Sequence, residues 1–442
     1  MCKMQILFFF TGNIVTELHV IALSKHIGQN GFVMACSLGM IDFISENIEK
    51  VDLASIQQGF IVACRDGSIK AVYAILQHEK SDVIVDSCDE NGSIGFMLAC
   101  KEGRIEVIEA CLEHSKSLTM IKATDNHGKT GFIIANEEGR IEVVKALLQH
   151  REAETMINAV DDDGQTGFIK ACQWGEVEIV KACLQHGNST IMIQATDKND
   201  QTGFMRACHR DRIEVVKAIL QHPMAEKVIE TSDINGDIGF IIACHWESVK
   251  TVSACLEHTK ADNMIKATDN NGQTGFMIAC HWDCIGVVRA CLQHPFSEIM
   301  IKATDNNGKT GFILACEEER IEVVKACLNH DSAKSMITAI NLNGQTGFII
   351  ACHWGSTEVV KACLEHPEAE TMIKATDNEG RIGFIIACQQ GHIETVRACL
   401  QYSNAEFMIN AADKNGQTGF IAACLLDRLD VVNVLLEYSE GI

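Results

Sequence analysis

The apolar and polar positions of this chain recur at a fixed interval. The dipeptide Gly-Phe, followed each time by an apolar residue, begins at Gly31, Gly59, Gly95, Gly131, Gly167, Gly203, Gly239, Gly275, Gly311, Gly347, Gly383 and Gly419. After a first spacing of 28 residues, all ten later spacings are 36 residues. Such a period predicts stacked supersecondary units that bury their apolar faces against one another. It overrides the prior of about three domains that the chain length alone suggests.

Residues 269–304 show how one unit is built. Asn271-Gly272 is a tight-turn signal, because glycine readily adopts positive φ. Thr274 is placed to cap the N-terminus of the helix that follows. We expect that helix from Phe276 to about Trp282.

A second helix is expected from Ile285 to about His294, after a break at Asp283 where many copies have glycine. Helices this short do not persist alone, so each pair must pack against its neighbours. Residues after the second helix, such as 366–376, complete the period. The three prolines, Pro223, Pro295 and Pro367, fall there, and we expect a short extra turn.

A turn followed by two short helices resembles the ankyrin repeat. The residues that carry the resemblance are Asp269, Gly272 and Thr274, then Ala279-Cys280, then the Val-Val of the second helix, as in residues 141–150. The resemblance implies an all-α fold, an ankyrin-type α-solenoid of about twelve helix-turn-helix repeats joined by hairpin-like turns. Two features depart from the family: Thr-Gly-Phe replaces Thr-Pro-Leu-His, and each full repeat is about three residues longer than the usual 33.

The period sets the expected domain organisation. Residues 29–442 form the repeat domain, with the 36-residue period starting at residue 59, and residues 1–28 form a degenerate N-terminal cap. The last repeat is expected to be a weak cap, because Leu425 and Leu426 replace polar residues there. Such an end favours weak self-association of a chain that is otherwise expected to be a monomer.

Charge narrows the partners. The formal net charge of −22 repels nucleic acids and anionic membranes, so we expect neither as a partner. No apolar run approaches the ~20 residues that a membrane span needs. The 21 cysteines are an odd number spread over a long chain, unlike a small disulfide framework, which favours a reducing compartment and a cytoplasmic location.

The cysteines and histidines raise the question of a metal or catalytic site, as in residues 351–366, where Cys363 and His366 share a helix face. Cysteine at the second-helix position alternates with Ile or Leu in other repeats, as Leu147 and Ile219 show, so it behaves as a small buried apolar residue. Structural zinc needs four converging ligands, and nucleophilic catalysis needs one distinguished site with an orienting group. We therefore expect no metal, no cofactor and no enzymatic activity.

The two residues after the first-helix cysteine vary most between repeats. All four tryptophans lie there, and we predict a partner-binding strip of Trp174, His209, Arg210, His245, Trp246, His281, Trp282, His353 and Trp354. The strip would be aromatic and weakly cationic, with adjacent tryptophans about 10 Å apart, the spacing of packed helices. Tryptophan is enriched at binding hot spots, but the same rings could instead cap the helix pairs.

The leading functional hypothesis is a non-enzymatic protein–protein interaction scaffold. It would bind a protein or peptide, basic and with apolar anchors, along the concave face lined by the first helices. Family analogy suggests as alternatives a substrate adaptor or a secreted effector, such as intracellular bacteria and large viruses deploy. A metal or redox protein and a mechanical spacer are two further alternatives.

Overall fold

The computed structural model describes residues 29–440, and the predicted cap at residues 1–28 lies outside them. The chain divides into two compact units, residues 1–203 and residues 204–442. Within each unit the described residues form successive helical repeats, and their only β pairing is a set of isolated bridges at the turns. The predicted all-α solenoid is confirmed.

Twelve pairs of first and second helices make up the described residues, as predicted. The first helices are α2 (Gln29–Leu38), α4 (Leu53–Asp66), α7 (Gly95–Glu102), α10 (Gly131–Glu137), α13 (Gly167–Trp174), α16 (Gly203–His209), α19 (Gly239–His245), α22 (Gly275–His281), α25 (Gly311–Glu317), α28 (Gly347–Trp354), α31 (Gly383–Gln390) and α34 (Gly419–Leu425). The second helices are α3 (Ile41–Asn47), α5 (Ile69–Leu76), α8 (Ile105–Glu113), α11 (Ile141–Gln149), α14 (Val177–Gln185), α17 (Ile213–Leu220), α20 (Val249–Leu256), α23 (Ile285–Gln293), α26 (Ile321–Leu328), α29 (Thr357–Leu364), α32 (Ile393–Leu400) and α35 (Leu429–Glu440).

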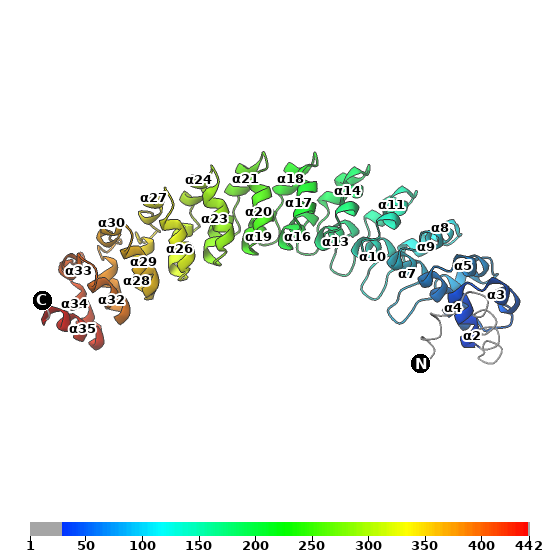
Figure 1. Cartoon of the computed structure of the whole chain (residues 1–442), viewed down its shortest axis with the longest axis horizontal. Coiled ribbons are helices and arrows are strands. Elements are labelled where there is room, and N and C mark those ends of the chain that lie inside the picture. Colours follow the sequence, from blue (N-terminus) through cyan, green and yellow to red (C-terminus); the bar gives the residue numbers. More distant parts are fainter. Residues whose placement is uncertain (1–28, 441–442) are drawn as a thin grey trace, which may run out of the picture. The chain divides into compact units, whose positions relative to one another are not determined.

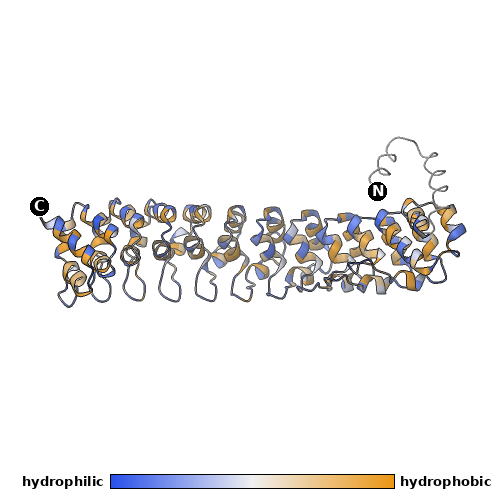
Figure 2. Ribbon diagram, turned by 90° about the horizontal axis from the view of Figure 1, so that it is seen from below, coloured by the Kyte–Doolittle hydropathy of each residue, from blue (hydrophilic) through white to orange (hydrophobic). Residues whose placement is uncertain are grey.

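A short third helix follows the second helix in ten repeats, where the sequence predicted an extra turn. These helices are α6 (Ser81–Ile84), α9 (Ser117–Lys122), α12 (Ala153–Ile157), α15 (Ser189–Gln194), α18 (Ala225–Ile229), α21 (Ala261–Lys266), α24 (Ser297–Lys302), α27 (Ala333–Ile337), α30 (Ala369–Lys374) and α33 (Ala405–Asn410). In the second unit, α18, α21 and α24 lie along one edge of the stack (Figure 1). The hairpin loops of that unit protrude along one side of the helices (Figure 2).

Aspartate organises each hairpin turn. In the turn before α22, the Asp269 carboxylate accepts hydrogen bonds from the backbone N–H groups of Asn271 (2.9 Å) and Gln273 (2.7 Å). Gly272 adopts a φ of +77°, as the turn requires. The Asn270 N–H donates to the Asn235 carbonyl of the preceding turn at 3.1 Å, so consecutive hairpins are hydrogen-bonded to each other.

The Thr-Gly-Phe motif combines a cap with close packing. The Thr274 hydroxyl accepts a hydrogen bond from the Met277 N–H at the start of α22, which confirms the predicted N-cap. A Cβ on Gly275 would come within 2.8 Å of the Cys244 sulfur and 2.9 Å of the Phe240 ring in the preceding repeat. Glycine is therefore required because the backbone of one repeat packs directly on the Phe and Cys side chains of the repeat before it.

Histidine at the end of the second helix joins neighbouring repeats. The His294 Nδ1 accepts a hydrogen bond from the Phe296 N–H at 3.2 Å, and its Nε2 donates to the Leu256 carbonyl of the preceding repeat, also at 3.2 Å. His330 and His366 make the same two bonds. Because Leu256 ends the preceding second helix, each imidazole satisfies a carbonyl that its own helix leaves unpaired.

Candidate partner-binding site

The variable pair of residues lies at the C-terminal end of each first helix. Trp174 and Trp354 are the last residues of α13 and α28, whereas Trp246 and Trp282 directly follow α19 and α22. Trp174 belongs to the first unit, and the other predicted strip residues belong to the second. In every case, the end of the helix directs this pair away from the core that its Phe and Cys occupy.

Five rings in the second unit form one continuous series, which we call the His–Trp ladder: His209, Trp246, His245, Trp282 and His281. The His245 ring is stacked against both indoles, with ring centroids 5.5 Å from Trp246 and 5.1 Å from Trp282. The two indoles therefore lie no more than about 10.6 Å apart, in agreement with the spacing expected for adjacent repeats. The ladder thus joins three successive repeats through side chains that are close in space but 36 residues apart in sequence.

The two ends of the ladder are made by tilted contacts. His209 lies 4.4 Å from Trp246 with the ring planes at 45°, and His281 meets Trp282 edge-on at 5.0 Å. Such offset and edge-to-face contacts are the favoured arrangements of aromatic pairs. His353 and Trp354 form a separate edge-on pair at 5.3 Å.

The ladder is exposed, although its rings contact one another. Trp246 and Trp282 expose 58% and 53% of their surface, whereas Phe240 and Phe276, on the same two helices, expose 1% each. The histidines between the indoles are half-buried. A ring that served only as a cap would bury most of its surface, so the indole edges remain available to a partner.

The histidines of the strip are not cationic at neutral pH, which corrects the expected weak positive charge. Burial and the nearby Arg210 and Arg206 lower the pKa of His209, and burial and His281 lower the pKa of His245. Burial, followed by His392 and Arg381, lowers the pKa of His353. Arg210 is therefore the one strip residue whose side chain carries a full positive charge at pH 7.

One nitrogen of the ladder argues against a purely structural role. The Nδ1 atom of His281 is buried and has no hydrogen-bond partner within residues 29–440. A buried polar atom left without a partner typically costs about 1–3 kcal/mol. His281 is thus an expensive choice for stability alone at a position where other repeats have Glu, Gln or Lys.

Acidic residues border the ladder in the loop to the second helix. Glu247 and Asp283, each directly after a tryptophan, are exposed and adopt φ of 53° and 64°, where Gly355 has 74° in its own repeat. The left-handed conformation is unfavourable for residues other than glycine. The Glu247 carboxylate uses it to accept a hydrogen bond from the Gly286 N–H of the next repeat at 3.3 Å. The sequence had suggested only a break in the helix at these positions.

The cysteine–histidine pair at residues 351–366 does not converge. Cys363 is fully buried, and burial raises the pKa of its thiol to about 12. The His366 ring is bonded to the Leu328 carbonyl and the Glu368 N–H. No group of three or more His, Cys, Asp or Glu side chains suited to a metal ion occurs within residues 29–440. The 20 described cysteines are all free thiols.

The C-terminal repeat exposes apolar side chains, as the sequence indicated. Leu425 and Leu426 are both exposed, at 65% and 51%. Among the described helices, none is long and apolar enough to cross a membrane.

Comparison with known proteins agrees with this geometry. A family model described as "Ankyrin repeats (3 copies)" matches residues 60–159, 152–232 and 369–442, which together cover more than half of the chain. A search of curated proteins found no match. The matched segments contain the turn, the Thr-capped first helix and the second helix described above. This chain therefore belongs to the ankyrin-repeat family.

Proposed function

We propose that this chain is a non-enzymatic scaffold that binds a partner protein through the exposed ends of its first helices. Ankyrin repeats generally mediate protein–protein interaction and are generally not enzymes. The observation that carries the proposal is the His–Trp ladder: a continuous series of rings whose two indoles remain more than half exposed. Exposed tryptophans in a preorganised row are typical anchors of an interface.

The chemistry of the ladder defines the partner. Apolar anchors spaced by about 10 Å would contact Trp246 and Trp282 together, since that is the spacing of adjacent repeats. Basic residues would meet the exposed Glu247 and Asp283, and the neutral histidines do not repel them. A basic protein or peptide with regularly spaced apolar side chains therefore fits best. We include Trp174, Arg210, His353 and Trp354 as flanking contacts.

The cytoplasm is the location that this proposal favours. The buried thiols, including both cysteine rows, are maintained most easily in a reducing compartment. An adaptor or a secreted effector would bind through the same surface, and a mechanical spacer would need no such surface. The partner experiment distinguishes the spacer from the other functions.

The test is affinity capture from the source cell with the wild-type chain and a Trp246→Ala/Trp282→Ala variant. Each substitution should weaken partner binding by about 2 kcal/mol, as truncation of a hot-spot residue does. Phe296→Ala is the matched control, because Phe296 is a similarly exposed aromatic of the same unit on the far side of the repeat. Equal capture by all three proteins would refute the ladder as the binding surface, and no capture by any of them would favour the spacer.

A further inference from the structure

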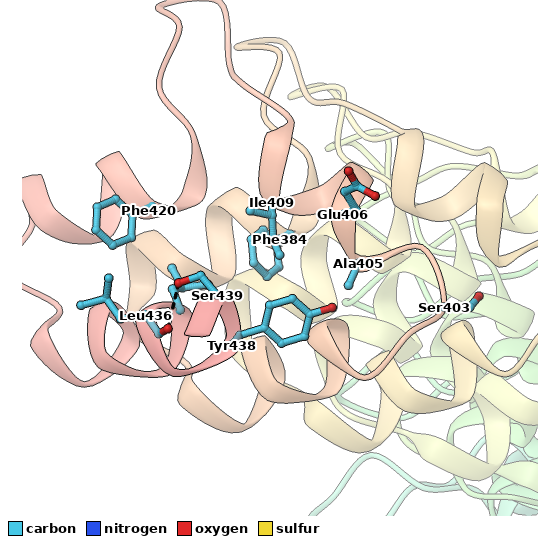
Figure 3. Close-up of a pocket in the computed structure, with 10 residues that line it drawn as sticks. Phe384, Ser403, Ala405, Glu406, Ile409, Phe420, Leu436, Tyr438 and Ser439 are labelled. Carbon is cyan, nitrogen blue, oxygen red and sulfur yellow. Dashed lines mark hydrogen bonds between the residues drawn. The ribbon is translucent and has the colours of Figure 1, made fainter. Parts of the chain in front are cut away.

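An open cavity lies beside the last second helix, α35, in the second unit. It has a volume of about 590 Å³, and its lining includes Phe384, Ala405, Ile409, Leu436 and Tyr438. Figure 3 shows these side chains around the opening, with Glu406 at its edge. The residues come from the third helix α33, from α31 and α34, and from α35 itself.

The preceding repeats show what occupies this position. In the second unit, the third helices pack against one another from repeat to repeat, as α21, α24 and α27 do. Each presents an adjacent pair of apolar residues to the core, such as Met264-Ile265 or Met372-Ile373, and both residues of each pair are almost fully buried. After α35, the described residues contain no third helix.

The effect of this difference appears in α33. Ile409 is only partly buried, although the equivalent Ile265, Ile301 and Ile373 in earlier third helices expose 2% or less. Met408 remains fully buried because it faces its own repeat. The cavity beside Ile409 therefore has the position that the third helix of a following repeat takes elsewhere.

Charge defines the incoming helix further. The Lys260 ammonium, just before α21, pairs with the Glu226 carboxylate of the preceding third helix at 2.8 Å. Asn404, just before α33, donates to the Glu370 carboxylate in the same way, also at 2.8 Å. Glu406 occupies the position of Glu226 and Glu370, is exposed, and has no such partner within the described residues.

We infer that this cavity binds a short amphipathic helix of a partner protein with the pattern Lys or Asn, then Ala, two variable residues, Met and Ile. The apolar pair fills the space beside Ile409 and Leu436, and the leading Lys or Asn binds Glu406. A second copy of this chain is a poor occupant, because the Met and Ile side chains of its own described third helices are already buried. The inference does not depend on the His–Trp ladder.

The test uses the full chain and a fluorescent peptide that copies residues 257–268, which contain Lys260, Met264 and Ile265. A peptide of this length is not helical in water and must order on binding, so we expect a dissociation constant on the order of 100 µM. Binding is measured by fluorescence anisotropy. Hydrogen exchange should show slower exchange in α33 and α35 when the peptide is bound.

Matched variants locate the peptide. Leu436→Asp in the chain, or Ile265→Asp in the peptide, should weaken binding about tenfold or more, as loss of a buried apolar anchor does. Leu425→Asp is the control, since Leu425 is exposed in the same repeat but does not line the cavity. Glu406→Lys should weaken binding severalfold, and Lys260→Glu in the peptide should restore it.

Three results would overturn the inference. The first is the absence of saturable binding up to about 1 mM peptide, well above the affinity expected for the site. The second is binding that Leu436→Asp leaves unchanged. The third is self-association of the free chain in sedimentation velocity that Leu436→Asp abolishes, which would make a second copy the occupant.

Discussion

The two ends of each first helix do different work. At the N-terminal end, Gly-Phe recurs in every repeat, and Phe240 and Phe276 are almost fully buried. At the C-terminal end, the residue pair differs from repeat to repeat, and Trp246 and Trp282 are more than half exposed. One end of the helix therefore fits each repeat to its neighbour, and the other is free to vary for recognition.

The last repeat shows that burial of the N-terminal end depends on the following repeat. Phe384 in α31 exposes 1% of its surface, and Phe420, at the same position in α34, exposes 39%. The difference arises because Gly419 of the next repeat packs on the Phe384 ring, whereas the described residues place no further first helix against Phe420. In a repeat protein, stability therefore resides largely in the interfaces between repeats.

The largest expected effect comes from breaking one such interface. Phe348→Ala should destabilise the surrounding repeats by about 3–5 kcal/mol, the range for removing a buried aromatic ring, because Phe348 is almost fully buried. Phe420→Ala is the matched control and should cost less than half as much. Hydrogen exchange of the local amides is the appropriate measurement, because a long repeat array need not unfold in a single step. Equal losses would contradict the dependence on a following repeat.

A smaller effect is expected from the second-helix cysteine row. Cys363→Ala should cost about 1–3 kcal/mol through lost packing, because the side chain is fully buried. Cys424→Ala, at an exposed cysteine, is the control and should cost much less. Stoichiometric zinc in protein purified without added metal, or strong destabilisation by a chelator, would show instead that these cysteines are ligands.

The ladder should also respond to acid, with a smaller effect on stability. Burial lowers the pKa of His209 and His245 below the usual value of 6.5, so folding favours their neutral forms. The stability they contribute is present above that value and is lost as the pH falls through their folded-state pKa values. Since both rings are partly exposed, we expect a fraction of the ~1.4 kcal/mol that a full pKa unit represents.

Titration of the histidine ring signals by NMR gives those pKa values directly. His245→Gln should remove part of the acid sensitivity of the amides near α19 and α22. A pKa for His245 at or above 6.5 would contradict the neutral ladder.

The fold was predictable from the sequence to an unusual degree because the chain repeats each signal many times. The turn at Asp269 to Gly272, the Thr274 cap and the helix pairs all follow from local rules that every copy repeats. Comparison among copies also identified Cys363 as an apolar residue, since Ile and Leu replace it elsewhere. The direction of the histidine bonds, toward the preceding repeat, could not be predicted, because substitution by Tyr402 or Tyr438 indicates only that a ring fits.

The site was predictable only in part. The sequence placed the tryptophans in one row, because a helix position is fixed by the period. It did not indicate that His245 lies between two indoles, which depends on side-chain directions across two repeats. The expected positive charge of the histidines was wrong for the same reason, since burial and neighbouring charges that appear only on stacking lower their pKa values.

The most direct measurement of this division of labour is the stability of the Trp246→Ala/Trp282→Ala variant, determined together with its affinity for the captured partner. Because the rings are exposed, the local unfolding free energy in α19 and α22 should change by less than about 1 kcal/mol. The partner affinity should fall by at least the ~2 kcal/mol expected for a hot-spot residue. A variant that binds the partner normally but loses local stability as Phe348→Ala does would show that the tryptophans are structural caps, and would contradict the account.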